Sequence, residues 1–138
     1  MREQHTAPDM FIRQLHDELS RFGPIQTDIF IQKSAAVYYG SKDRLGAEGD
    51  FTTAPEISQL FGELIGRALA QSWIDQGMPT PFVLTELGPG NGTLMADILR
   101  ATKSVPNFHA SMELHLVEAS TEMRERQKSA LSGYNITW

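Results

Sequence analysis

The sequence predicts an α/β chain in which a helical N-terminal region precedes the first part of a parallel β-sheet. Two patterns carry this prediction: apolar residues recur at helical intervals in the first half of the chain, and short apolar runs alternate with helical patterns in the second. The breaker cluster GMPTP at residues 77–81 separates the two patterns. We therefore expect a helical region over residues 1–77 and a sheet region over residues 78–138.

Two helices and a loop are expected at the start of the chain. The first helix covers residues 6–22, where apolar residues recur at three- and four-residue spacing until Gly23-Pro24 ends the pattern. A less regular helical pattern covers residues 27–37. The stretch 40–50 combines three glycines with five charged residues and has no hydrophobic period, which is typical of a loop.

The clearest helical pattern covers residues 53–73. Thr53 and Glu56 have the spacing of a capping box, in which two side chains satisfy the free amides of the first turn. Phe61 and Trp73 are expected in the core. A second stripe along this helix has almost no side chains and consists of Ser58, Gly62, Gly66 and Ala70. It predicts the close approach of a helix or strand, with a ligand near the backbone as the alternative.

The remaining chain alternates strictly between strand and helix patterns. The expected elements, in the order strand, helix, strand, helix, strand, cover residues 82–87, 94–101, 112–118, 120–131 and 135–138. Alternation at these lengths is typical of a parallel sheet with right-handed crossover connections. In such sheets, ligands bind beyond the carboxyl ends of the strands.

A glycine-rich turn follows the first expected strand. In the stretch TELGPGNGTL, residues 85–94, three glycines fall within five positions. Gly88, Gly90 and Gly92 can adopt positive φ and expose their amides, and the N-terminus of the next helix carries a partial positive charge. The turn therefore predicts a site for a ligand with an anionic group.

The spacing of these glycines restricts the ligand. A nucleoside-triphosphate loop needs a lysine after its last glycine, but Thr93 follows Gly92 here. A dinucleotide loop has the spacing G-x-G-x-x-G, whereas this turn is one residue shorter and is preceded by Glu86. A carboxylate at that position would face a pyrophosphate poorly and an ammonium group well.

S-adenosylmethionine meets these requirements. Glu86 could attract its ammonium group, and the glycine amides could bind its carboxylate. Glu118 ends the second expected strand, where a carboxylate can accept both hydroxyls of the ribose. An acid at this place also occurs in dinucleotide-binding enzymes, so a nicotinamide- or flavin-dependent oxidoreductase stays an alternative.

Composition excludes several other classes. A net charge of −5 argues against a large nucleic-acid interface. The chain has no cysteine, and its four histidines never have the spacing of metal ligands on one helix face, so no metal site is expected. No apolar run reaches the roughly 18 residues of a membrane span, and the N-terminus has neither a secretory nor a transit pattern. A bacterial protein of this kind is expected in the cytoplasm.

The sequence also resembles a known family. The run ELGPGNGTL followed by LHLVE resembles the class I S-adenosylmethionine-dependent methyltransferases. GDFTTAPEISQLFGELIG, residues 49–66, resembles the MidA-type branch of that family, and the resemblance extends over about residues 8–138. It implies a Rossmann-like methyltransferase fold. Family members continue through further strands, so we expect this chain to contain the N-terminal portion of the fold only.

The resemblance also implies a site and a reaction. With Glu86, the implied cofactor contacts are Gly88, Gly90, Gly92 and Glu118. The substrate-side candidates are Asp50, Thr53 and Glu56, while no residue is assigned as catalytic. Mitochondrial members of this branch are complex I assembly factors that methylate an arginine of a complex I subunit, which implies a protein substrate and, in a eukaryote, a location in the mitochondrial matrix. A non-catalytic assembly module is the alternative for this chain alone, and the oligomeric state is not predicted.

Overall fold

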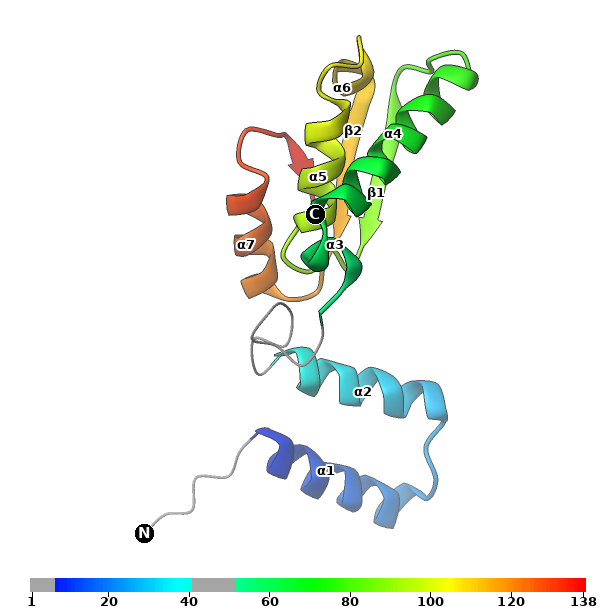
Figure 1. The fold of residues 1–138 in the computed structure, drawn as a ribbon. Helices are drawn as coiled ribbons and strands as arrows, with labels where there is room; N and C mark the ends of the chain where they lie inside the picture. The colour runs from blue at the N-terminus through cyan, green and yellow to red at the C-terminus, as the bar shows by residue number, and fades with distance from the viewer. Residues whose placement is uncertain (1–6, 41–51) are drawn as a thin grey trace. The chain divides into compact units, whose positions relative to one another are not determined.

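The computed structural model describes residues 7–40 and 52–138 (Figure 1). The chain divides into two compact units, Met1–Arg44 and Leu45–Trp138. The predicted boundary near residue 77 falls inside the second unit, between a helix and the strand that follows it. Each unit has its own set of contacts.

The first unit is a pair of helices, α1 (Ala7–Phe22) and α2 (Thr27–Gly40). Gly23 adopts a φ of 80° and donates its amide to the Leu19 carbonyl, which ends α1 in the left-handed conformation that glycine accepts without strain. Lys33 of α2 forms an ion pair with Glu18 of α1. Both helices agree with the predicted ranges, although α2 extends to Gly40.

The second unit contains a three-stranded parallel sheet in the order β1-β2-β3 (Figure 1). Its strands are β1 (Phe82–Leu87), β2 (Met112–Val117) and β3 (Ile136–Thr137), and Leu84, Leu114 and Ile136 lie in register. The connections contain α5 (Thr93–Thr102), the short α6 (Phe108–Ser111), which was not predicted, and α7 (Thr121–Ala130). The predicted alternation and the parallel sheet are confirmed.

The capping box predicted for Thr53 and Glu56 is wrong. The Thr53 side chain forms no capping hydrogen bond, and α3 (Ala54–Ile57) is a single turn. The backbone is extended at Ser58, with φ −149° and ψ 119°, and α4 (Gln59–Asp75) begins after it. The continuous helix expected over residues 53–73 is therefore two helices. The Glu56 side chain bonds to Thr93, a distant part of the chain, instead of to its own helix end.

The stripe of small residues packs α4 against α5, as the sequence predicted. A Cβ added at Gly62 would lie 2.5 Å from Cβ of Asp97, and one added at Gly66 would lie 3.0 Å from Cα of Ile98. Real Cβ atoms essentially never approach another heavy atom as closely as the first distance, so α5 occupies space that any larger residue would need. This contact packs α4 against α5 within the second unit, Leu45–Trp138.

The core lies between the sheet and its helices. Trp73 is buried, packs edge-on against Phe108 and donates its indole N–H to the Pro79 carbonyl at 2.9 Å. Phe61, which was also expected in the core, is 41% exposed, so that prediction is wrong. The larger core cluster contains Met95, Ile98, Leu99, Leu114, Leu116 and Leu131.

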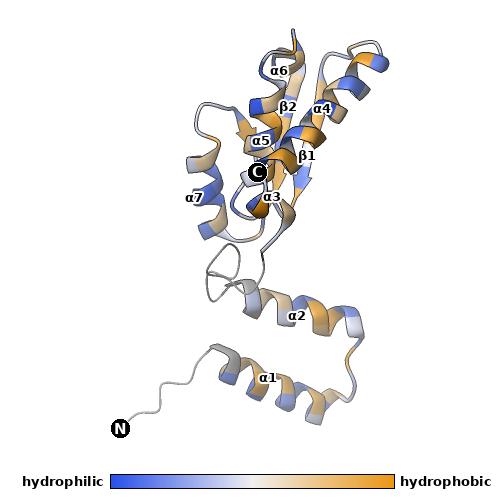
Figure 2. Cartoon of the chain, viewed as in Figure 1, coloured by the Kyte–Doolittle hydropathy of each residue, from blue (hydrophilic) through white to orange (hydrophobic). Residues whose placement is uncertain are grey.

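Hydrophilic residues predominate on α7, whereas apolar residues mark the strands and parts of α4 and α5 (Figure 2). Within residues 7–40 and 52–138, none of the helices has both the length and the apolar character that crossing a membrane requires.

Candidate functional site

The glycine turn joins the carboxyl end of β1 to the N-terminus of α5. Its three glycines adopt positive φ, 63° at Gly88, 55° at Gly90 and 83° at Gly92. The Gly88 amide donates to the Val117 carbonyl at 2.9 Å, and the Gly92 amide donates to the Pro89 carbonyl at 2.8 Å. Because side-chain-bearing residues are strained at positive φ, this turn needs glycine at all three positions.

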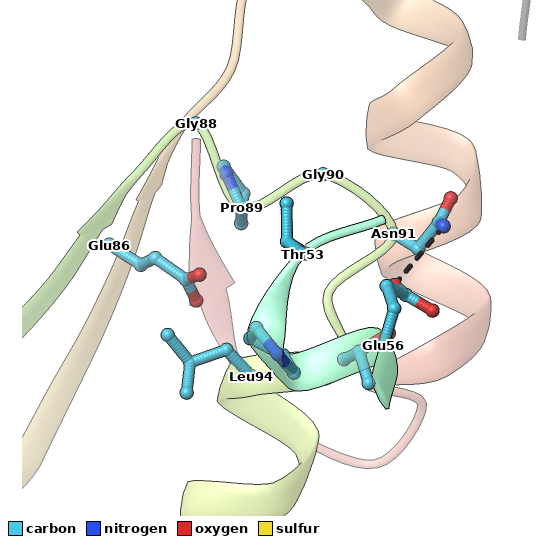
Figure 3. A pocket seen from close by; sticks show the side chains of 10 residues that line it. Thr53, Glu56, Glu86, Gly88, Pro89, Gly90, Asn91 and Leu94 are labelled. Carbon is cyan, nitrogen blue, oxygen red and sulfur yellow. Dashed lines mark hydrogen bonds between the residues drawn. The ribbon is translucent and has the colours of Figure 1, made fainter. Parts of the chain in front are cut away.

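A cavity of about 210 Å³ lies beside this turn (Figure 3). It is bounded by the start of α3, the end of β1, the turn and the start of α5. Its lining consists of Thr53, Pro55, Glu56, Glu86, Gly88, Pro89, Gly90, Asn91, Thr93 and Leu94. The structure therefore brings together five of the candidate residues that the sequence placed in two separate segments.

Glu86 is the half-buried acid of this cavity (Figure 3). Its Oε2 atom is buried and has no hydrogen-bond partner among the described residues. Burial raises the pKa of Glu86 to about 7, because removal from water disfavours the charged form. A cation placed beside this carboxyl would favour its ionised form and would supply the missing partner.

Glu56 connects α3 to the glycine turn. Its Oε1 atom accepts a hydrogen bond of 2.7 Å from the Thr93 hydroxyl and a longer one of 3.3 Å from the Asn91 amide, which is the dashed line in Figure 3. Glu56 and Thr53 thus lie at the same cavity as Glu86. The third substrate-side candidate, Asp50, falls outside the described residues.

Glu118 follows β2 and does not line the cavity. Its Oε1 atom accepts a hydrogen bond from the Ser120 amide at 2.8 Å, and its Oε2 atom accepts one from the Gln127 side-chain amide at 3.3 Å. The same Gln127 nitrogen donates to the Gly90 carbonyl at 2.8 Å. Glu118 and the turn are therefore joined through one side chain.

Sequence reasoning did not identify Gln127. Its neighbours in α7 form a charged pattern that is typical of a solvated helix face, yet the Gln127 side chain is 0% exposed. The position of Leu131, buried four residues later, was the available signal, because residues four apart lie on one face of a helix.

The family is decided by a match over residues 64–138 to the model of S-adenosyl-L-methionine-dependent methyltransferases. This chain belongs to that family. S-adenosylmethionine is the cofactor of the family, as the glycine turn and the resemblance predicted, and the oxidoreductase alternative receives no support.

Several relatives of this methyltransferase-family chain carry a more specific name. It is 40% identical to the mitochondrial protein arginine methyltransferase NDUFAF7 of Bos taurus, over 94% of this chain and 31% of the relative. The identity to NDUFAF7 of Homo sapiens is 39%, over 88% of this chain and 29% of the relative. The chain thus spans about 30% of the length of these curated relatives, which agrees with the expected partial coverage of the family.

A solved structure supports the fold assignment. A protein of Burkholderia thailandensis, crystallised with S-adenosyl-homocysteine bound, superposes with a TM-score of 0.78 at 27% identity. The match covers 96% of this chain and 37% of that protein. The Rossmann-like methyltransferase fold is confirmed for the part that this chain contains.

Proposed function

We propose that this chain forms the cofactor-binding part of a methyltransferase that modifies arginine in a protein. The observation that carries the proposal is the unpartnered carboxyl oxygen of Glu86 in a cavity that the glycine turn lines. Membership of the S-adenosylmethionine-dependent family supports the cofactor, and the names of the relatives support an arginine acceptor.

The proposed cofactor contacts divide into two groups. At the cavity, Glu86 attracts the ammonium group, and the turn formed by Gly88, Gly90 and Gly92 approaches the carboxylate. The Gly88 and Gly92 amides already donate to the Val117 and Pro89 carbonyls, so among the three glycines we assign the Gly90 amide to the ligand. Small-molecule pockets commonly have volumes of about 300–1,000 Å³, so a smaller cavity suits the amino-acid end of the ligand alone. Glu118, outside the cavity, then accepts the ribose hydroxyls. Two of its approximately four acceptor positions are used within the protein, and the other two remain for the hydroxyls.

The chemistry that this site would serve needs alignment more than reactive side chains. S-adenosylmethionine supplies a methyl group on a positively charged sulfur, and its transfer is an in-line displacement. The residues of the site bind and orient the reactants and exclude water. An arginine acceptor stays protonated in water, so carboxylates must hold it and take up a proton. We propose that the segment containing Asp50, Thr53 and Glu56 lies on the acceptor side, and we assign no catalytic residue.

The acceptor and the location follow from the resemblance. The MidA-type branch suggests that the acceptor is an arginine of a complex I subunit. The names of the curated relatives place them in mitochondria, which favours the mitochondrial matrix if this chain is eukaryotic. For a bacterial source we propose the cytoplasm.

Calorimetric titration of the full chain with S-adenosylhomocysteine tests the cofactor assignment. We expect binding to the unsubstituted chain and at least tenfold weaker binding to Gly90→Val, because a branched side chain is strained at the φ of 55° and Gly90 lines the cavity. Gly133→Val is the matched control, since Gly133 also has a positive φ of 99° but lies outside the cavity lining. Equal affinity of the two variants would remove the glycine turn from the site, and tighter binding of NADH would favour an oxidoreductase.

A further inference from the structure

Gln127 is the one residue that hydrogen-bonds to both the glycine turn and Glu118 among the contacts of the described residues. Its Nε2 atom donates to the Gly90 carbonyl at 2.8 Å and to the Glu118 carboxylate at 3.3 Å. Its Oε1 atom accepts the indole N–H of Trp138 at 2.9 Å. Both N–H donors and the carbonyl oxygen of this amide are therefore in use, as a side chain that is 0% exposed requires.

These three bonds determine how the side chain lies. Oε1 faces an indole N–H, so the amide cannot be turned over without placing Nε2 against a donor and Oε1 against two acceptors. Gly92 packs on the same side chain, because a Cβ added there would lie 3.5 Å from Cγ of Gln127. The orientation of Gln127 is thus determined by both packing and hydrogen bonding.

The bond to Gly90 also orients the peptide that follows it. In a planar trans peptide the carbonyl oxygen and the next amide N–H point in opposite directions. With the Gly90 carbonyl directed at Gln127 of α7, the Asn91 N–H points away from α7. Gln127 therefore keeps the Gly90 carbonyl directed toward α7, and the Asn91 N–H lies on the opposite side of the turn.

The bond to Glu118 controls the second carboxylate oxygen. The Ser120 amide holds Oε1, and Gln127 holds Oε2, so the two bonds together prevent rotation of the carboxylate. Unused acceptor positions remain on both oxygens, which is what two adjacent hydroxyls of a ribose need. A carboxylate with only one of these bonds could rotate and would lose entropy when the hydroxyls bind.

We propose that Gln127 is a positioning residue for the cofactor, holding the Glu118 carboxylate at a constant place relative to the glycine turn. This inference rests on the proposed function, because it assigns Glu118 to the ribose. Gln127 itself contacts no ligand. Its effect passes through Glu118, and it selects for ligands that carry the ribose hydroxyls.

A pair of ligands separates this role from a merely structural one. The test measures, by calorimetry on the full chain, the affinity for S-adenosylhomocysteine and for its analogue without the two ribose hydroxyls. Gln127→Met keeps the shape of the side chain and removes both donors. We expect this variant to bind S-adenosylhomocysteine about tenfold more weakly, as loss of a hydrogen bond to a charged group implies. Its affinity for the analogue should fall by a clearly smaller factor, since the analogue makes no use of Glu118 and is affected only through the lost bond to the Gly90 carbonyl.

Trp138→Phe is the matched control. It removes the third partner of Gln127 and leaves the bonds to Glu118 and Gly90 in place, so we expect the preference for the ribose hydroxyls to be kept. A variant that is partly unfolded would bind both ligands more weakly by the same factor, so the ratio of the two affinities would not change.

The outcomes are distinguishable from one another. If Gln127→Met weakens both ligands equally, or weakens neither, while the unsubstituted chain binds S-adenosylhomocysteine, the positioning role is overturned and the proposed function stands. If the unsubstituted chain does not bind S-adenosylhomocysteine at all, the proposed function and the role of Gln127 are overturned together.

Discussion

The Glu56 carboxylate accepts a 2.7 Å hydrogen bond from the Thr93 hydroxyl, 37 residues later in the chain. This bond joins α3 to the first residue of α5 and places α3 beside the glycine turn. A four-residue helix has too few internal hydrogen bonds to be stable by itself, so α3 depends on such contacts. The acceptor-side segment is therefore positioned by the same turn that we assign to the cofactor.

Removal of the Thr93 hydroxyl should loosen α3. Thr93→Val keeps the shape of the side chain and deletes the donor, and we expect the hydrogen-bonded amides of Glu56, Ile57 and Ser58 to exchange about fivefold faster, as the loss of about 1 kcal/mol implies. Hydrogen exchange followed by mass spectrometry measures this rate. Thr85→Val on an exposed position of β1 is the control. Unchanged exchange in α3 would show that other contacts hold it.

The buried carboxyl of Glu86 should make stability depend on pH. Its pKa is raised from 4.5 to about 7 in the folded chain, so the folded state retains a proton that the unfolded chain releases. Below pH 4.5 the carboxyl is protonated in both states and costs the folded state nothing. As pH rises from 4.5 toward 7 the free energy of unfolding falls progressively, and above pH 7 it stays at the lower value.

Glu86→Gln tests this sign. The melting temperature of the variant should equal that of the unsubstituted chain near pH 4.5 and exceed it at pH 8, by an amount on the order of a few degrees. Scanning calorimetry at both pH values gives the comparison, with Glu113→Gln at an exposed position of β2 as control. The account of Glu86 fails if the difference does not grow with pH.

Ligand binding should depend on the same carboxyl in the opposite sense. An ammonium group prefers the ionised form of Glu86, whose pKa is about 7, so roughly one tenth of the chains are competent at pH 6 and nine tenths at pH 8. We expect the affinity for S-adenosylhomocysteine to rise about tenfold over this range and the pH dependence to disappear in Glu86→Gln. A pH dependence that survives the substitution would assign the proton to another group.

The contact between α4 and α5 should not tolerate a methyl group. Gly62→Ala would gain about 1 kcal/mol of helix propensity. The new Cβ would lie 2.5 Å from Cβ of Asp97, which is bonded to the α5 backbone and cannot rotate away. Overpacking against an immobile neighbour costs about 1–3 kcal/mol, so after the gain in propensity we expect a net loss of about 1 kcal/mol in the free energy of unfolding.

Denaturant unfolding measures this loss. Arg67→Ala, on the exposed side of the same helix, changes propensity without creating the clash and should stay within about 0.5 kcal/mol of the unsubstituted chain. Equal stability of Gly62→Ala would mean that the two helices can separate without cost.

Local sequence patterns predicted most of the helices and strands of the second unit, Leu45–Trp138. The strand at residues 82–87 was predicted with its observed bounds, because an apolar run between a breaker cluster and a glycine turn has few other readings. The stripe at Gly62 and Gly66 predicted the approach of another element, since small residues at four-residue spacing form a groove along a helix.

Tertiary contacts account for what the sequence did not predict. The spacing of Thr53 and Glu56 suits a capping box, but Glu56 bonds to Thr93, and no local pattern contains a partner so far along the chain. Gln127 was missed for the same reason, because its bond to Gly90 spans 37 residues. Phe61 continues the apolar period of its helix, yet the part of the chain that the structure describes leaves it 41% exposed.

A crystal structure of the full chain with S-adenosylhomocysteine tests the central claim most directly. The account predicts the ribose hydroxyls within about 3 Å of the Glu118 carboxylate, and the ligand ammonium at Glu86 directly or through one water. A ligand whose ribose lies away from Glu118 and whose amino group lies away from Glu86 would contradict it.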